Sequence, residues 1–167
     1  MIVNYNELPK IRKKHKNDKI VMLKGTFDLF HIGHLNLLKR AKSLGDVLVV
    51  VLKCDEVVKL KSDDRPIIDE TNRALIVDSI VYTDYTIIAN QKFFIDNDII
   101  LSENDRIQYQ RYSKIINELK PDILVKQPNH DIPVPLLQLY KKYSTQIIEI
   151  DRTKGISTTE LIEKIRR

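Results

Sequence analysis

Short apolar runs alternate with amphipathic helical patterns along this chain, and the alternation restricts its fold more than any other feature. The runs are rich in Val, Ile and Leu, as in buried parallel strands, and they lie at 20–23, 46–52, 85–89, 123–125 and 146–150. Parallel strands need crossover connections, which helices supply. The alternation therefore predicts an α/β fold built on a five-stranded parallel sheet.

The segments between these runs carry the helical patterns that crossovers require. One helix is expected before the first strand, and apolar residues recur at helical spacing over 34–44, 71–80, 102–120, 135–144 and 158–167. Gly45 follows the first of these patterns, where a helix C-cap favours a left-handed residue. Ser102, three residues before Asp105, predicts a helix start, and Pro121 predicts the end of that helix. No repeat or flexible linker interrupts the sequence, so we expect a single domain, residues 1–167.

Composition narrows the setting in which the chain works. Cys54 is its only cysteine, so no intrachain disulfide is expected. Residues 1–19 do not resemble a secretory signal, and no apolar run approaches the ~20 residues of a membrane-spanning helix. We therefore expect a soluble cytoplasmic protein that does not enter a membrane.

The net charge of +5 admits two interpretations. RNA binding is one of them, and its support is a basic cluster made of Lys10, Arg12, Lys13, Lys14, Lys16 and Lys19. Aromatic residues that would stack on bases are not interleaved with this cluster. A positive balance equally suits an enzyme whose substrates are polyanionic phosphates, and no nucleic-acid partner is expected.

The first strand-to-helix transition reads Gly-Thr-Phe-Asp-Leu-Phe-His-Ile-Gly-His over 25–34. Ligands of open parallel sheets bind where strands pass into helices, and a helix N-terminus favours phosphate. His31 and His34, with Gly33 between them, would place two donors where negative charge grows during attack at phosphorus. The alternatives are solvent-exposed histidines at a helix start, or a zinc site that lacks its remaining ligands.

The last strand-to-helix transition, 151–160, is rich in cations and hydroxyls. Arg152 and Lys154 precede Gly155, and a run of hydroxyl residues follows it. This composition suits phosphate oxygens gripped by charge-assisted hydrogen bonds. Ser157 and Glu160 also have the spacing of a capping box, so a well-capped helix is the structural alternative.

The two transitions together resemble the cytidylyltransferase family, in particular the glycerol-3-phosphate cytidylyltransferases, from about residue 20 onward. Class I aminoacyl-tRNA synthetases share the first motif but are far longer. The resemblance implies a Rossmann-like three-layer α/β/α fold and a homodimer. It also implies attack of a substrate phosphate on the α-phosphorus of CTP, with Mg²⁺ present and pyrophosphate released, without a covalent enzyme intermediate.

The resemblance also implies residue roles. The catalytic residues would be His31, His34, Lys61 and Arg152. The nucleotide would be held by these four and by Gly25, Thr26, Phe27, Gly33, Thr153, Gly155, Ile156, Ser157, Thr158 and Thr159. The acceptor would be bound by Asp28, by Asp55 at the end of the second strand, by Lys59 and by Arg73. Without the resemblance, Lys59 and Lys61 could equally be exposed loop lysines, and Asp55 and Arg73 could be members of surface ion pairs.

A second resemblance bears on the substrates. Segments 65–68 and 120–126, with Arg73, are similar to the nucleotidyltransferase domain of ADP-heptose synthases, which use ATP and a sugar 1-phosphate. The Gly-Ile-Ser-Thr-Thr run favours CTP. Both families usually show Gly-Gly-Asp or Gly-Asp after the fourth strand, where this chain has Gln127-Pro128-Asn129. Segment 91–115 is also longer than in either family and could cap the acceptor pocket or form a dimer contact.

The sequence therefore predicts an enzyme that transfers a nucleotidyl group, preferably CMP from CTP, to a small phosphorylated alcohol or sugar. The alternatives are an ATP-dependent adenylyltransferase that acts on a sugar 1-phosphate, a nucleotide-binding protein without catalysis, and an RNA-binding protein. The enzyme hypothesis requires the two transitions to face each other at one edge of the sheet.

Overall fold

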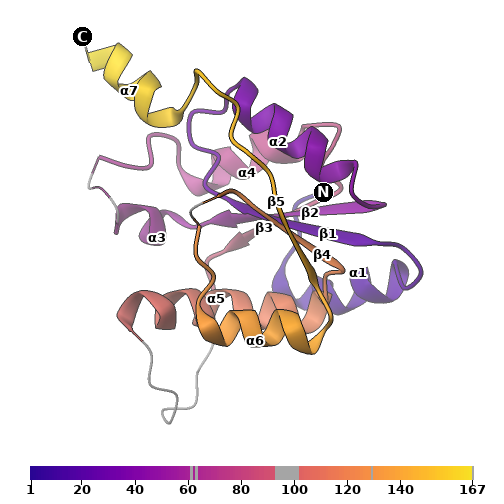
Figure 1. Ribbon diagram of the computed structural model, residues 1–167. Helices are drawn as coiled ribbons and strands as arrows, with labels where there is room; N and C mark the ends of the chain where they lie inside the picture. The colour runs from indigo at the N-terminus through magenta and orange to yellow at the C-terminus, as the bar shows by residue number, and fades with distance from the viewer. Residues whose placement is uncertain (61, 63, 93–101, 129, 167) are drawn as a thin grey trace.

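Five parallel strands form one sheet in the computed structural model, which describes residues 1–60, 62, 64–92, 102–128 and 130–166 (Figure 1). The strand order is β3-β2-β1-β4-β5. The strands are β1 (Ile20–Gly25), β2 (Val47–Lys53), β3 (Tyr85–Ala89), β4 (Ile123–Lys126) and β5 (Gln146–Glu149). The predicted five-stranded parallel sheet is confirmed.

The strand order places a switch in chain direction beside β1. From β1 the chain moves outward through β2 to β3, then returns to add β4 and β5 on the other side. Leu23 of β1 pairs with Val50 on one side and Val125 on the other. Ligands of such sheets bind outside the carboxyl ends of the strands at this switch point, and the first motif directly follows β1.

Helices cover both faces of the sheet and produce the expected three layers (Figure 1). One face carries α2 (Ile32–Lys42) and α4 (Glu70–Asp78), and the other carries α1 (Leu8–Lys14), α5 (Glu103–Leu119) and α6 (Val134–Lys142). The last helix, α7 (Thr158–Arg166), projects from the sheet beside α2. In the described parts of the chain, no helix is long and apolar enough to cross a membrane.

Alternation along β1 divides the core between the two faces. Ile20 and Met22 pack with residues of α1, α5 and α6, whereas Val21 and Leu23 pack with residues of α2 and α4. All four side chains are fully buried. Because side chains alternate along a strand, each strand of this kind contributes to both cores, and its sequence reads as a continuous apolar run.

The starts of two helices, at Ser102 and at Asp55, differ in how far the sequence predicts them. Ser102 accepts a hydrogen bond from the Asp105 N–H at 3.2 Å, so the expected start of α5 is confirmed. Asp55, expected at the end of the second strand, instead begins the short helix α3 (Asp55–Lys59), because β2 ends at Lys53. Five residues are too few for a periodic apolar pattern, so the sequence contained no signal for this helix.

Gly45 is needed for a different reason than we expected. Helix α2 ends at Lys42 with a right-handed C-cap at Ser43, and Gly45 does not have a positive φ. A Cβ atom at Gly45 would lie 2.6 Å from the Lys19 carbonyl oxygen and 2.7 Å from a methyl carbon of Val21. The prediction of a left-handed cap was therefore wrong, and the glycine allows the chain to pass close to the start of β1.

We expect Gly45→Ala to lower the free energy of unfolding by about 1–3 kcal/mol, because the backbone atom that the new methyl group meets cannot rotate away. Urea denaturation followed by circular dichroism measures this loss. The exposed neighbour substitution Ser43→Ala is the control and should change stability by less than about 0.5 kcal/mol. Equal effects of the two substitutions would contradict the steric argument.

Candidate active site

The turn that follows β1 has an unusual backbone. Phe27 and Leu29 have positive φ values of 56° and 45°, which are uncommon for residues with side chains. Phe27 is buried, and a Cβ atom at Gly25 would lie 2.4 Å from its ring. Gly25 is therefore the residue that lets the Phe27 ring fold back under the turn. Backbone strain of this kind persists where the surrounding structure fixes it, often at functional sites.

His31 and His34 form the N-terminal cap of α2. The Gly33 N–H donates to Nδ1 of His31 at 3.0 Å, and the His31 N–H donates to Nδ1 of His34 at 3.3 Å. A neutral imidazole whose Nδ1 accepts carries its proton on Nε2. The two rings stack with their centres 3.9 Å apart. Helix capping thus fixes both tautomers and leaves two Nε2–H donors side by side.

Gly33 is required by the same arrangement. A Cβ atom there would lie 2.8 Å from Cε1 and 2.9 Å from Nδ1 of His31. The His31 ring would have to leave its capping position. The glycine between the two histidines is therefore a steric condition for the pair.

Burial keeps the two imidazoles neutral. Burial and, to a smaller extent, the neighbouring His31 lower the pKa of His34 to about 4, against the attraction of Asp28. The pKa of His31 is also lowered by burial, which the Glu160 carboxylate opposes. At neutral pH the site therefore offers two uncharged donors rather than two cations.

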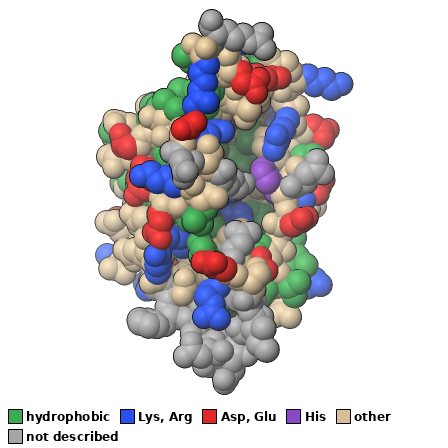
Figure 2. Space-filling view, turned by 90° about the vertical axis from the view of Figure 1, so that its left-hand side faces the viewer, with side chains coloured by type: hydrophobic (Ala, Val, Ile, Leu, Met, Phe, Trp, Pro, Cys, Tyr) green, Lys and Arg blue, Asp and Glu red, His purple; other side chains and the backbone are tan. Residues whose placement is uncertain are grey.

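The second predicted transition faces the first. Thr158 Oγ1 donates to the Asp28 carbonyl oxygen at 2.9 Å, and Asn36 of α2 donates to Thr153 Oγ1 at 3.4 Å. A methyl carbon of Ile156 would lie 3.5 Å from a Cβ at Gly33. The two segments thus meet at the carboxyl edge of the strands, as the enzyme hypothesis requires. Figure 2 views this edge and shows a hollow with a histidine at its wall and Lys or Arg side chains within it.

The rest of this segment combines capping with exposed cations. Ser157 caps α7, because its Oγ accepts from the Glu160 N–H at 3.2 Å. Gly155 has a φ of 78°, which explains the glycine. Arg152, Lys154 and Thr159 are exposed. Both interpretations of the segment, helix cap and phosphate grip, are therefore compatible with the structure.

Arg73 is a buried junction beneath the site. Its side chain is 0% exposed, and its guanidinium donates to the carbonyl oxygens of Ile68, Thr26 and Lys53. It also pairs with Asp55 Oδ1 at 2.6 Å. Arg73 and Asp55 thus form the ion pair considered from the sequence, but its arginine is buried and its aspartate is only partly exposed. Direct contact of either residue with an acceptor stays a prediction.

Asp28 is likewise held inside the protein. It is 1% exposed and accepts from the backbone N–H groups of Ile67 and Ile68 and from the Arg65 guanidinium. These bonds attach loop 65–68 to the turn that carries the histidines. In the sequence, Arg65 belongs to a segment that is similar to ADP-heptose synthases, but no local pattern indicates its pairing with Asp28, which is 37 residues away. Acceptor binding by Asp28 stays a prediction.

The remaining predicted residues are described only in part. Lys59 is exposed at the end of α3. Lys61 and Asn129 lie outside the described residues, as does 93–101 within the long segment 91–115. Among the described residues, no group of three or more His, Cys, Asp or Glu could hold a metal ion.

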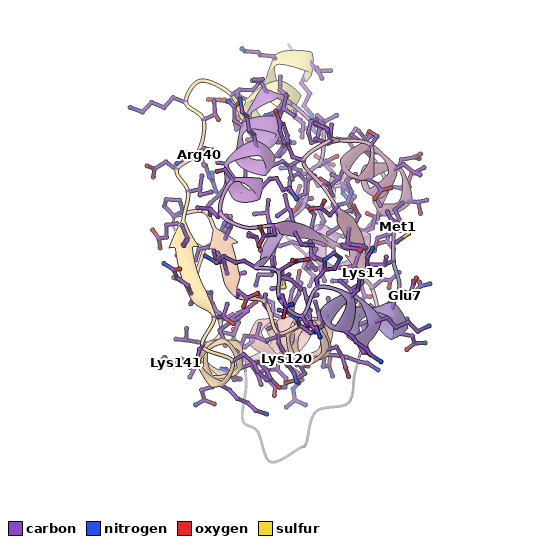
Figure 3. The ribbon with its side chains drawn as sticks, turned by 90° about the vertical axis from the view of Figure 1, so that its right-hand side faces the viewer. Met1, Glu7, Lys14, Arg40, Lys120 and Lys141 are labelled. Atoms are coloured by element: carbon purple, nitrogen blue, oxygen red, sulfur yellow. The ribbon has the colours of Figure 1, made fainter. Side chains whose placement is uncertain are left out.

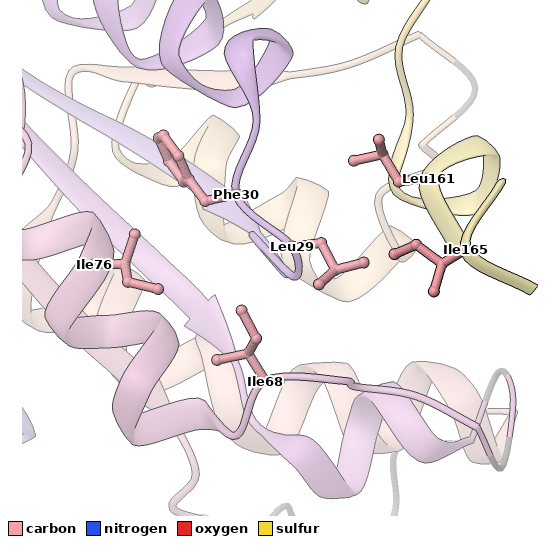
Figure 4. A pocket seen from close by; sticks show the side chains of 6 residues that line it. All are labelled: Leu29, Phe30, Ile68, Ile76, Leu161 and Ile165. Atoms are coloured by element: carbon pink, nitrogen blue, oxygen red, sulfur yellow. The ribbon is translucent and has the colours of Figure 1, made fainter. Parts of the chain in front are cut away.

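An apolar cavity lies beside the site. It has a volume of about 480 Å³. The side chains of Leu29, Phe30, Ile68, Ile76, Leu161 and Ile165 line it, between α7, the first turn and α4 (Figure 4). Such a lining offers no donors to a phosphate, so this cavity is unsuited to the triphosphate.

The basic segment that supported RNA binding lies at the opposite edge of the sheet (Figure 3). Arg12 is used internally, where it pairs with Asp122 at 3.1 Å. Lys14 donates to the Tyr85 hydroxyl at 3.2 Å. This cluster is therefore remote from the two facing turns, and part of its charge stabilises the fold.

Comparisons with known proteins agree with the geometry. The family described as cytidylyltransferase-like matches residues 22–164. "Bifunctional protein HldE" of Helicobacter pylori (strain G27) is 37% identical over 155 residues, which cover 92% of this chain and 29% of that protein. HldE of Helicobacter hepaticus is 34% identical and covers 99% of this chain and 30% of its own length. The chain therefore spans under a third of the curated relatives that it matches.

Solved structures share the fold. A lipopolysaccharide core biosynthesis protein from Thermoplasma volcanium has a TM-score of 0.55 and 26% identity, covering 83% of this chain and 99% of that one. A pantoate-beta-alanine ligase from Francisella tularensis has a TM-score of 0.65 at 19% identity, covering 99% of this chain and 77% of that one. At this identity the second similarity concerns the fold alone.

We expect Arg73→Met to lower the free energy of unfolding by about 3–5 kcal/mol, because it leaves buried carbonyl oxygens and Asp55 without their donor. Urea denaturation measures the loss. Arg40→Met is the matched control, since the exposed Arg40 guanidinium makes one hydrogen bond to the described residues, to the Asp151 carbonyl at 3.3 Å. Its cost should stay below about 1 kcal/mol. Similar costs would refute the role of Arg73 as a junction.

The lowered pKa of His34 also predicts a pH dependence of stability. The unfolded state binds a proton near pH 6.5 and the folded state only near pH 4. Stability is therefore retained above pH 6.5 and lost as the pH falls, by at most about 1.4 kcal/mol per pH unit for one proton. In His34→Asn the slope between pH 6.5 and 4 should be shallower in urea denaturation. Parallel curves would mean that His34 is not the group responsible.

Proposed function

The chain belongs to the cytidylyltransferase-like family, and from this premise we propose that it transfers an adenylyl group from ATP to a sugar 1-phosphate. Both enzyme hypotheses, transfer of CMP and transfer of an adenylyl group, are forms of nucleotidyl transfer. The HldE relatives, at 34–37% identity over nearly the whole chain, support the adenylyl alternative better than transfer of CMP. The similarity of segments 65–68 and 120–126 to ADP-heptose synthases supports it too.

One observation carries the proposal: the stacked pair His31 and His34 presents two neutral Nε2–H donors opposite the segment 152–159. An oxygen of the acceptor phosphate attacks the α-phosphorus, the bond to the bridging oxygen of the β-phosphate breaks, and pyrophosphate leaves with that electron pair. The two donors stabilise the negative charge that grows on the α-phosphate oxygens. They are positioned before the reaction, because helix capping holds both rings.

The other residues would position the two anionic substrates. Arg152 and the hydroxyls of Ser157 and Thr159 grip the triphosphate from the side opposite the histidines, while Thr158 holds this segment to Asp28. Lys59 and Lys61 bind phosphate groups near the acceptor. Mg²⁺ accompanies the triphosphate and neutralises part of its charge, since this ion is typically held by substrate phosphates and few carboxylates. The homodimer and the cytoplasmic setting expected from the sequence stay predictions.

Transfer of CMP is the second candidate, because the run Gly155-Ile156-Ser157-Thr158-Thr159 resembles that of glycerol-3-phosphate cytidylyltransferases. Nucleotide binding without catalysis is the third, because Pro128 fixes φ and removes a donor in the loop after β4. The three differ in which nucleotide is consumed and in whether pyrophosphate forms.

A pyrophosphate-release assay that crosses ATP, CTP, GTP and UTP with sugar 1-phosphates and glycerol 3-phosphate tests the proposal. We expect turnover with ATP and a sugar 1-phosphate. His31→Ala and His34→Ala should each lower kcat by about 10²–10³-fold, as expected when a donor to the developing charge is lost. His15→Gln, at the opposite edge of the sheet, should keep full activity.

Each result supports one hypothesis. Turnover with CTP alone would restore the cytidylyl interpretation. Nucleotide binding by calorimetry without pyrophosphate from any pair would leave a binding protein and refute the proposed reaction. Full activity of both histidine variants would refute the proposed mechanism.

A further inference from the structure

Three neighbouring strands place a lysine on the same face of the sheet at their carboxyl ends. Lys24 pairs with Val51 across β1 and β2, and Val51 belongs to the core under α1, α5 and α6. Lys53 lies two residues beyond Val51, and Lys126 lies two residues beyond Leu124 of the same core. Because side chains alternate along a strand, all three lysines lie on the α5 side of the sheet.

Lys24 combines partial burial with the lack of a carboxylate partner among the described residues. It is half-buried, and its Nζ lies 4.6 Å from the centre of the Tyr112 ring of α5. No hydrogen bond or ion pair joins Lys24 to a carboxylate anywhere in the described part of the chain, whereas Lys126 pairs with Glu149. Burial and the positive charge of Lys53 lower the pKa of Lys24 to about 8. The negative charge of an anion bound here would offset both the loss of solvent around the Lys24 ammonium and its repulsion from Lys53.

The polar groups below Lys24 are also incompletely paired. The hydroxyl groups of Tyr112 and Tyr140 and Nε of Arg111 are buried and have no hydrogen-bond partner among the described residues. The Glu56 carboxylate is engaged by Arg111 at 2.8 Å and by Lys92 at 2.6 Å. The Glu56 carboxylate is therefore already shared by two cations other than Lys24.

Lys24 and Lys53 lie next to segments that take part in the proposed reaction. Lys24 directly precedes Gly25 and the turn that carries the histidines, and the Lys53 carbonyl shares the Arg73 guanidinium with the Thr26 carbonyl. The histidines belong to α2, on the other face of the sheet. The proposed nucleotide site and the two lysines thus lie on opposite sides of the end of β1. An acceptor bound at the α-phosphate would have to extend past this end of β1 to reach Lys24.

Resting on the proposed function, we propose that Lys24 and Lys53 form an anion subsite for a second acidic group of the acceptor. The acceptor is then a sugar 1-phosphate that carries a further phosphate or a carboxylate at the end remote from its reacting phosphate. A phosphate monoester has a charge near −2 at neutral pH, which two lysines can balance. The subsite selects among sugar phosphates by charge, whereas Lys59 binds the phosphate common to all of them.

Glucose 1-phosphate, glucose 1,6-bisphosphate and glucuronic acid 1-phosphate are the probes, because they share the reacting phosphate and differ at the remote end. Calorimetry with a non-hydrolysable ATP analogue present measures their binding, and pyrophosphate release measures their use. We expect glucose 1,6-bisphosphate to bind about tenfold or more tightly than glucose 1-phosphate, as for a charge-assisted contact. Lys24→Met and Lys53→Met should each remove most of this preference without weakening the binding of glucose 1-phosphate.

Lys142→Met is the matched control, because Lys142 also lies over a tyrosine ring, 5.2 Å from the centre of Tyr143. It should retain the full preference. Weaker binding of the ATP analogue itself in Lys24→Met would assign the lysines to the triphosphate and overturn the subsite.

No preference for the bisphosphate, no binding of it, or a preference that survives both substitutions would also overturn the subsite. Failure of the subsite is distinguishable from failure of the proposed function. An enzyme that releases pyrophosphate without such a preference refutes the subsite alone. A protein that shows the binding preference but releases no pyrophosphate refutes the reaction alone.

Discussion

The buried guanidinium of Arg73 is the contact on which the site depends. The segments of the candidate site are turns that follow strands, and their carbonyl groups have left the hydrogen-bonded ladder of the sheet. Arg73 supplies donors to the carbonyl oxygens of Thr26, Lys53 and Ile68, and so fixes the ends of β1 and β2 and the loop after α3 relative to one another. A lysine could not replace it, because three carbonyl groups and a carboxylate require the planar fork of donors.

Helix capping orients the two histidines of the first motif, next to the turn that Arg73 fixes. In most capped helices a hydroxyl or carboxylate accepts from the first turn, whereas here the acceptors are the Nδ1 atoms of His31 and His34. The same bonds that begin α2 therefore leave each Nε2–H free to donate. Burial adds the second condition, because it keeps the pKa of both rings low. In the proposed mechanism the site stabilises charge by oriented dipoles, which need no reorganisation during the reaction.

The sheet, its helices and the meeting of the two turns could be predicted, because periodic apolar patterns and the carboxyl-edge rule act locally or follow from strand direction. Helix α3 could not, since it is too short to show a period. The role of Gly45 was mistaken because its constraint is the Lys19 carbonyl, 26 residues away. The partners of Asp28 lie 37–40 residues further along the chain. Such contacts depend on packing that no local pattern encodes.

The distribution of charge at the end of β1 addresses a difficulty that any enzyme of this kind meets. Both proposed substrates are anions, and their approach is opposed by mutual repulsion. Interactions that bind the ground state and the transition state equally add little to the rate, so the donors at the reacting phosphorus must respond to the charge that forms during transfer. Here the groups on the α2 side are neutral imidazoles, while Lys24 and Lys53 lie on the α5 side. In the proposed mechanism, Lys24 and Lys53 attract the remote end of the acceptor, while the neutral donors at phosphorus respond to the charge that forms during transfer.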